Sequence, residues 1–320
     1  MSTGCFISPG RTMEGAIERV KLAESLGYES VYVTHIAGRE SLTVLTAYAM
    51  ATSEIRVGTG VVPIYTRTPV TMAQTAATID ELSGGRLTLG LGVSHRVVVE
   101  SWHGQTIDRP VHEMREYVAI VRAILRGEDP PAGEKWRTGF RLVGLDPRPQ
   151  LPIYVAALSP AMLRLAGEVA DGVLLWLCCP DYIRDVVIPE VTAGRERAGR
   201  TLKGFDIVPA VPAAVLEDPA GAYAAMRRDL LPYFSLPFYR AMLERSGFGA
   251  EIEGYDAASG DVGQMEAAIS ERFLGQLTAV GDASAVRAGL ERYRAAGAST
   301  PCVGPIPKTD FEATLRAGIE

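Results

Sequence analysis

Short apolar runs and helical patterns alternate along this chain, most clearly in its first third. The runs at 56–62 and 84–95 are rich in β-branched residues or leucine, flanked by glycine, and apolar at odd and even positions alike. This is typical of strands buried on both faces of a parallel sheet. Between them, Thr68 and Pro69 are suited to begin a helix and Gly84 to end it. The stretch therefore predicts a strand–helix–strand unit.

The same alternation continues to the end of the chain. Further strands are predicted at 5–8, 30–34, 152–157, 171–176, 205–216 and 298–304, and further helices at 12–26, 41–52, 159–169, 182–198, 282–296 and from 310. Strands that alternate with helices form parallel sheets with right-handed crossovers. Eight such units favour an α/β fold of the closed type, a TIM (β/α)8 barrel, over an open doubly wound sheet.

Two long insertions interrupt the alternation, after strands four and seven. The first, at about 96–150, holds one clear helix near 112–126 and then a proline- and glycine-rich stretch with a small hairpin predicted around 135–142. The second, at about 218–281, is predicted to be mostly helical with a polar break at 249–263. We expect one barrel domain over residues 1–320, with both insertions roofing a pocket.

Composition narrows the kind of protein. The chain has 320 residues, 47% hydrophobic and 22% charged, with a mean hydropathy of +0.10, which is typical of a globular protein with a large core. The net charge of −6 and only four dispersed lysines give no basic patch, so we expect neither nucleic acid nor a membrane as partner. The four cysteines form no disulfide or metal pattern, and no apolar run reaches ~18 residues, so we expect a cytoplasmic protein with buried thiols.

Chemistry in such a barrel lies at the carboxyl ends of the strands. Small residues dominate the predicted ends, with few carboxylates and no cluster of His, Asp and Glu. This argues against metal-assisted hydrolysis and against paired glycosidase acids, and predicts no metal site. Glycines at strand ends let the backbone approach a flat or phosphorylated ligand, so a bound small-molecule cofactor is favoured.

Several motifs, taken together, resemble one known family over essentially the whole chain. They are LGYESVYV at 26–33, RVGTGVV at 56–62, AATIDELSGGRLTLGLG at 76–92, AGEVADGVL at 166–174, AVGD at 279–282 and YRAAG at 293–297. The chain is similar to the bacterial luciferase-like enzymes that use flavin or the deazaflavin F420, and most similar to the F420 branch that includes methylene-tetrahydromethanopterin reductase. The resemblance implies a TIM barrel with insertions, usually a homodimer, with F420 or FMN at its top.

The resemblance also implies roles for particular residues. Gly58, Thr59, Gly60 and Val61 match a strand bulge that supports the cofactor ring, with a non-proline cis peptide expected at Gly60–Val61. The positions expected to border the rest of the cofactor are Gly90, Gly92 and Ser94 beside the ring, and Ala157, Leu158 and Ser159 at the phosphate. His35 lies where many F420 enzymes carry an Asp-His pair, but here Thr34 precedes it. We take His35 as the candidate catalytic residue.

Each of these residues also has a purely structural interpretation. Crowding inside a narrow barrel would account for the glycines at 58 and 60, helix capping for Ser159, and a hydrogen bond within its loop for His35. After strand four, His95, Arg96, Trp102 and His103 either line a substrate pocket or pack the insertion. The predicted function is hydride transfer between F420 and an unidentified small molecule. The alternatives are an FMN-dependent monooxygenase and a non-catalytic member that binds flavin or F420.

Overall fold

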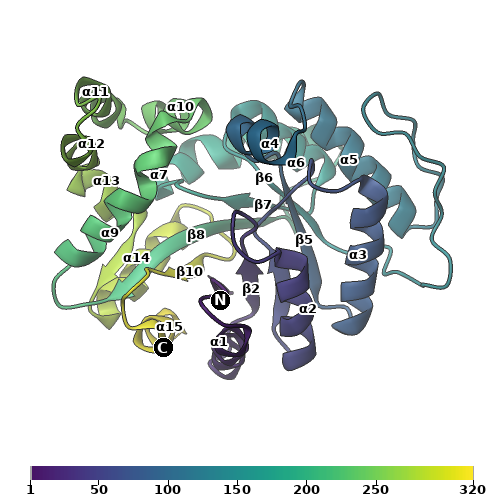
Figure 1. Cartoon of the computed structure of the whole chain (residues 1–320), viewed down its shortest axis with the longest axis horizontal. Helices are drawn as coiled ribbons and strands as arrows, with labels where there is room; N and C mark the ends of the chain where they lie inside the picture. The colour runs from purple at the N-terminus through teal and green to yellow at the C-terminus, as the bar shows by residue number, and fades with distance from the viewer. Residues whose placement is uncertain (1, 320) are drawn as a thin grey trace.

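Eight parallel strands close into a barrel that helices surround (Figure 1). This computed structural model describes residues 2–319. In ring order the strands are β10 (Cys302–Pro305), β1 (Gly4–Phe6), β2 (Ser30–Val33), β3 (Arg56–Thr59), β5 (Leu87–Gly92), β6 (Ile153–Ala156), β7 (Gly172–Leu175) and β8 (Asp206–Val215). The ring closes because β10 pairs with both β1 and β8. The predicted TIM barrel is confirmed.

Two short strands were not predicted as separate elements. The strand expected at 56–62 is broken: β4 (Val62–Pro63) pairs with β5 after a gap at residues 60 and 61. β9 (Ala279–Gly281), inside the stretch expected to be helical, pairs with the second half of β8. β8 is long enough to pair with β7 in its first half and with β9 beyond it.

The outer helices follow the predicted starts and stops. They are α1 (Met13–Ser25), α2 (Ser41–Ala51), α3 (Pro69–Leu82), α6 (Pro160–Val169), α8 (Ile188–Arg197), α14 (Ala283–Ala295) and α15 (Phe311–Ile319). The side chains of Thr12, Thr68, Ser159 and Asp282 each accept a backbone N–H in the first turn of their helix. Gly84, with φ of +66°, follows α3 in the left-handed conformation expected of a helix stop. The helix expected from 182 begins earlier, as α7 (Pro180–Tyr182), and runs through a π-helical turn (Ile183–Val187) into α8.

The first insertion differs from the prediction in two ways. It contains a helix that was missed, α4 (Arg96–His103), before the expected α5 (Pro110–Leu125). The hairpin predicted near 135–142 is wrong, because no residue of 128–150, all of which the structure describes, is in a strand. The segment is held by side chains instead: the Glu116 carboxylate accepts the backbone N–H groups of Glu134 and Lys135, at 2.7 and 3.0 Å.

The second insertion is helical, as expected, but the polar break predicted at 249–263 is shorter than expected and covers only residues 258–261. It comprises α9 (Ala220–Leu230), a 3₁₀ turn (Leu231–Ser235), α10 (Pro237–Arg245), α11 (Gly249–Ala257), α12 (Val262–Ala268) and α13 (Glu271–Leu277). The rest of the stretch 249–263 forms α11 and the start of α12, because Ile252 is buried against the insertion and Gly254 lets Ala268 approach. Tertiary packing here overrides the low helix propensity of glycine.

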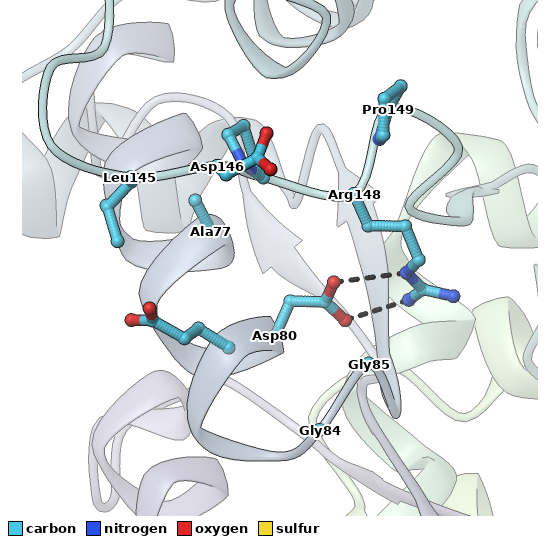
Figure 2. Close-up of a pocket in the computed structure, with 10 residues that line it drawn as sticks. Ala77, Asp80, Gly84, Gly85, Leu145, Asp146, Arg148 and Pro149 are labelled. Atoms are coloured by element: carbon cyan, nitrogen blue, oxygen red, sulfur yellow. Dashed lines mark hydrogen bonds and ion pairs between the residues drawn. The ribbon is translucent and has the colours of Figure 1, made fainter.

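The amino-terminal end of the barrel is tied by charged side chains (Figure 2). The Arg148 guanidinium donates to both carboxylate oxygens of Asp80, at 2.8 and 3.0 Å, and Asp80 also accepts the N–H of Leu87. Asp80 is buried, and this pairing compensates its charge. Nearby, Arg86 donates to the carbonyls of Ala49 and Ile55. The motif at 76–92 thus joins helices to strands at the end of the barrel opposite the expected site.

Two further expectations can be compared with the structure. The four cysteines are buried free thiols, as predicted. Within residues 2–319, no helix is long and apolar enough to cross a membrane.

Candidate functional site

Most of the predicted site residues lie at one rim of the barrel, because all strands are parallel and run toward it. His35 follows β2, Gly60 and Val61 lie between β3 and β4, and Ser94 follows β5. The turn at 157–159 follows β6. The barrel therefore brings these positions to one mouth, while Gly58 and Gly90 lie deeper, within their strands.

The gap between β3 and β4 contains the expected cis peptide at Gly60–Val61. At this gap the hydroxyl of Thr59 takes over the sheet pairing. It donates to the carbonyl of Gly90 at 2.7 Å and accepts the Gly90 N–H at 2.8 Å. One side chain thus satisfies both backbone groups of Gly90, and the sheet stays paired where the backbone changes direction.

The four glycines of β3, β5 and the gap after β3 face neighbouring side chains or backbone. A Cβ atom at Gly58 would lie 2.7 Å from the Tyr32 ring, and one at Gly92 would lie 2.5 Å from Cγ2 of Val61. Added Cβ atoms at Gly60 and Gly90 would collide with the Phe6 ring and the Thr59 carbonyl. Crowding therefore accounts for all four glycines, and their contact with a cofactor stays a prediction.

The side chains that occupy the space beside these glycines form an apolar floor at the mouth of the barrel. Tyr32, Tyr154, Leu174, Val208 and Cys302 form a buried cluster inside the barrel. Phe6 and Val61 pack on this cluster and stay partly exposed, and the Phe6 and Tyr32 rings stack with centroids 5.3 Å apart. A flat ring that lies on Phe6 and Val61 would meet only apolar atoms of these two side chains.

The turn after β6 offers hydrogen-bond donors to an anion. The N–H groups of Leu158 and Ser159 make no hydrogen bond within residues 2–319, and they lie at the start of α6. The Ser159 hydroxyl accepts the Met162 N–H as a helix cap, which leaves its own hydrogen free to donate. Ala157 differs from the prediction in that its N–H already donates to the Leu174 carbonyl, at 3.4 Å. Leu158 and Ser159 thus fit a phosphate better than Ala157 does.

His35 is held by a group that the sequence analysis missed. Its Nδ1 lies 3.1 Å from the Ser41 hydroxyl and 3.5 Å from a carboxylate oxygen of Glu40, and its side chain is 12% exposed. Its Nε2 makes no hydrogen bond within the described part of the chain. Many F420 enzymes have an Asp directly before this histidine, where this chain has Thr34. Here Glu40, five residues after His35, places a carboxylate beside the ring instead.

Glu40 is fixed by several partners of its own. Its carboxylate caps α2 by accepting the N–H groups of Leu42 and Thr43, at 3.0 and 2.7 Å, and lies 3.0 Å from Nη2 of Arg67. Burial opposes its ionisation, but the hydrogen bonds from His35, Thr43 and the backbone outweigh burial and hold the pKa of Glu40 well below its usual range. Glutamate is an uncommon N-cap residue, so capping rules gave no signal for this role.

Among the four residues after β5 that the sequence analysis named, one side chain packs at the mouth and three are exposed to solvent. The His95 ring packs on Tyr233 and Tyr239 of the second insertion, with centroids 6.1 and 5.6 Å away. Trp102 on α4 is 55% exposed, and His103 and Arg96 are exposed too. Of the four residues left open between pocket and packing, His95 faces the insertion and these three face solvent.

The barrel and its rim are those of an enzyme with its chemistry at the carboxyl ends of the strands. A family model described as luciferase-like monooxygenase matches residues 2–300. A Mycobacterium tuberculosis protein, provisionally named as a coenzyme F420-dependent oxidoreductase, is 31% identical over 308 residues, covering 88% of this chain and 87% of its own. The 5,10-methylenetetrahydromethanopterin reductase of Methanolobus tindarius is 31% identical over 271 residues, covering 83% and 82%.

A solved structure agrees with these sequence relatives. The coenzyme F420-dependent tetrahydromethanopterin reductase of Methanopyrus kandleri matches 99% of this chain and 96% of its own with a TM-score of 0.81 and 25% identity. The chain belongs to the luciferase-like monooxygenase family. It is an enzyme, and its resemblance to the F420 branch is confirmed by these relatives.

Proposed function

We propose that this enzyme is an F420-dependent oxidoreductase, which transfers a hydride between the deazaflavin and a small-molecule substrate. The observation that carries the proposal is the make-up of the mouth. An apolar floor and two free backbone N–H groups lie on the same rim as one histidine that a carboxylate supports. The F420-dependent relatives support the choice of cofactor.

Different residues of the chain would bind the cofactor and assist the hydride transfer. Phe6 and Val61 would support the ring, and the N–H groups of Leu158 and Ser159 would bind the phosphate. When bound, F420 supplies the carbon that gives or takes the hydride. His35 would hold a proton on Nε2 for the substrate oxygen, while Glu40 and Ser41 orient the ring from the Nδ1 side.

Titration with each cofactor tests the proposal. We expect the purified protein to bind F420 tightly, seen by F420 absorbance and fluorescence, and to bind FMN far more weakly. Tight FMN binding without F420 binding would overturn the proposal in favour of a flavin-dependent monooxygenase, for which the matching family model speaks. Binding of neither cofactor would overturn it in favour of a non-catalytic role.

Substitution of His35 tests the mechanism. With any substrate that oxidises or reduces F420, His35→Gln should lower kcat by about 10²-fold or more, because general acid–base catalysis contributes about that much. F420 affinity should stay the same, since the imidazole is not assigned to hold the cofactor. His103→Gln, the same change on the exposed face of α4, is the matched control and should keep full turnover. Unchanged kcat in His35→Gln would remove the catalytic role.

A further inference from the structure

The rim bends sharply at three residues that are not glycine, Ser94, Leu177 and Lys308, and the first two lie beside aromatic side chains. Ser94, after β5, has φ of +59°, and Leu177, after β7, has φ of +61°. This left-handed conformation is unfavourable for residues that carry a Cβ, and non-glycine examples gather at functional sites. These first two bends adjoin His95 and Trp176, and both of these side chains meet the second insertion.

His95 and Trp176 pack with two tyrosines of the second insertion. We call this group of four side chains the aromatic wall: His95, Trp176, Tyr233 and Tyr239. The Tyr233 ring lies 4.8 Å from Tyr239 and 6.2 Å from Trp176, centroid to centroid, with both pairs edge to face. His95 packs on both tyrosines. In the ring of strands, β7 lies opposite β2, so the aromatic wall stands across the mouth from the strand that ends at His35.

Trp176 carries an unused hydrogen-bond donor. Its Nε1–H is buried and has no partner of ordinary hydrogen-bond geometry within residues 2–319. Burial raises the pKa of the Tyr233 hydroxyl, and the indole, which interacts with this hydroxyl, lowers that pKa by less, but the pair does not meet hydrogen-bond geometry. A buried donor without an acceptor is unfavourable, so a ligand that brings an acceptor gains affinity there.

The aromatic wall carries no charge near neutral pH. Burial lowers the pKa of His95, so its ring is neutral, and burial raises the pKa of both tyrosines. Asp229 is the charged group whose field reaches Tyr233, and it repels anions. An ammonium group, in turn, brings no acceptor for the free indole N–H. These two groups leave a neutral molecule with an acceptor oxygen as the best match.

We propose that the substrate is a neutral, largely apolar molecule whose carbonyl or hydroxyl oxygen accepts a hydrogen bond from Nε1–H of Trp176. Asp229 then disfavours carboxylates and phosphates, and an ammonium group would leave the Trp176 N–H without an acceptor. This proposal rests on the proposed oxidoreductase function, because it assigns the substrate side of the same mouth.

The indole N–H resonances report directly on this contact. The chain has three tryptophans, Trp102, Trp136 and Trp176, so labelling of tryptophan with nitrogen-15 gives three indole N–H signals. The signal that disappears in Trp176→Phe is that of Trp176. The probes are cyclohexyl methyl ketone, cyclohexanecarboxylate and cyclohexylmethylammonium, which share a ring and differ in charge. We expect the ketone alone to move the Trp176 signal downfield in a saturable manner. The exposed Trp102 serves as the internal control.

Affinity gives a second readout. Trp176→Phe keeps an aromatic ring and removes the donor, so the Kd for the ketone, measured by calorimetry, should rise about three- to tenfold. Trp102→Phe should leave this Kd unchanged. No shift with the ketone, an equal shift with either charged probe, or an unchanged Kd in Trp176→Phe would each overturn the proposal.

Titration with F420 separates this proposal from the function it rests on. A Trp176 signal that moves with F420 alone would make Trp176 a cofactor contact and overturn the substrate proposal. If F420 fails to bind while the ketone still moves the signal, the oxidoreductase proposal fails and the neutral-ligand site stands. If F420 binds and the ketone has no effect, only the substrate proposal fails.

Discussion

At the residue scale, Glu40 shows how one carboxylate joins local structure to the site. It caps α2, pairs with Arg67 and lies beside Nδ1 of His35. Because the cap fixes the carboxylate, the start of α2 also fixes the orientation of the histidine. Loss of Glu40 is therefore expected to affect both the stability of the fold and the site.

Glu40→Gln gives a pH-dependent prediction. The folded state holds the pKa of Glu40 below its unfolded value of about 4.3, so ionised Glu40 stabilises the fold fully above that pH. This stabilisation is lost as the pH falls through the folded pKa. Glu40→Gln should therefore lower the free energy of unfolding by about 1 kcal/mol at pH 7 and by less as the pH falls below about 4.

Urea unfolding at pH 7, 5, 4 and 3 measures this difference. Glu18→Gln makes the same chemical change at an exposed position of α1, where the carboxylate forms an exposed ion pair with Lys21 at 3.8 Å, and should change stability little. A difference for Glu40→Gln that grows toward low pH would contradict the assignment.

At the element scale, a buried ion pair between Lys135 and Glu113 helps to hold the irregular segment 128–150. Lys135 Nζ donates to the Glu113 carboxylate at 2.9 Å and to the Thr106 carbonyl at 2.5 Å, and lies 4.7 Å from the centre of the Tyr65 ring. Glu113 is buried at the start of α5 and also accepts the Tyr65 hydroxyl. The segment therefore has a fixed course without a strand or helix of its own.

Lys135→Met should release this segment. The change leaves the Glu113 carboxylate buried without its cation, which costs about 3 kcal/mol or more when one partner of a buried pair is removed. We expect faster chymotryptic cleavage at Trp136 and Phe140, followed by mass spectrometry. The double variant Glu113→Gln with Lys135→Met should recover part of the resistance, and Lys203→Met, at an exposed position, should match the unaltered protein. Equal cleavage of Lys135→Met and the unaltered protein would show that the ion pair does not hold the segment.

At the scale of the whole molecule, the two ends of the chain close the barrel together. β10 pairs with β1 on one side and β8 on the other, and the Tyr28 hydroxyl donates to the carbonyl of Leu315 in α15. Closure therefore joins the first strand of the barrel to the last one.

Removal of residues 298–320 should abolish the folded barrel. It deletes β10 and α15 and leaves β1 and β8 with unpaired edges, which promote aggregation. We expect loss of the near-ultraviolet circular dichroism signal and of the monomeric or defined oligomeric peak in gel filtration. Arg316→Ala in the full chain, which changes only an exposed side chain of α15, should keep both signals. A truncated chain that melts cooperatively would contradict this dependence on closure.

The prediction from sequence succeeded where a few consecutive residues carry the signal. Helix caps such as Thr68, stops such as Gly84 and buried strand runs are local patterns, and they gave the eight units and hence the barrel. It failed for the hairpin at 135–142, and it made the break predicted at 249–263 too long. There, buried side chains such as Lys135 and Ile252 decide the course of the backbone, and their partners lie elsewhere in the chain.

The sequence by itself determined the barrel, the positions of its insertions, the rim that carries His35 and the glycine-rich strands beside it. Only the tertiary structure decided that packing accounts for those glycines, that Glu40 stands beside His35, and that Tyr233 meets Trp176. The physical reason is the separation along the chain of the residues that interact. Strand and helix patterns depend on neighbours in the chain, whereas these contacts depend on how the closed ring and its insertions bring distant segments to one mouth.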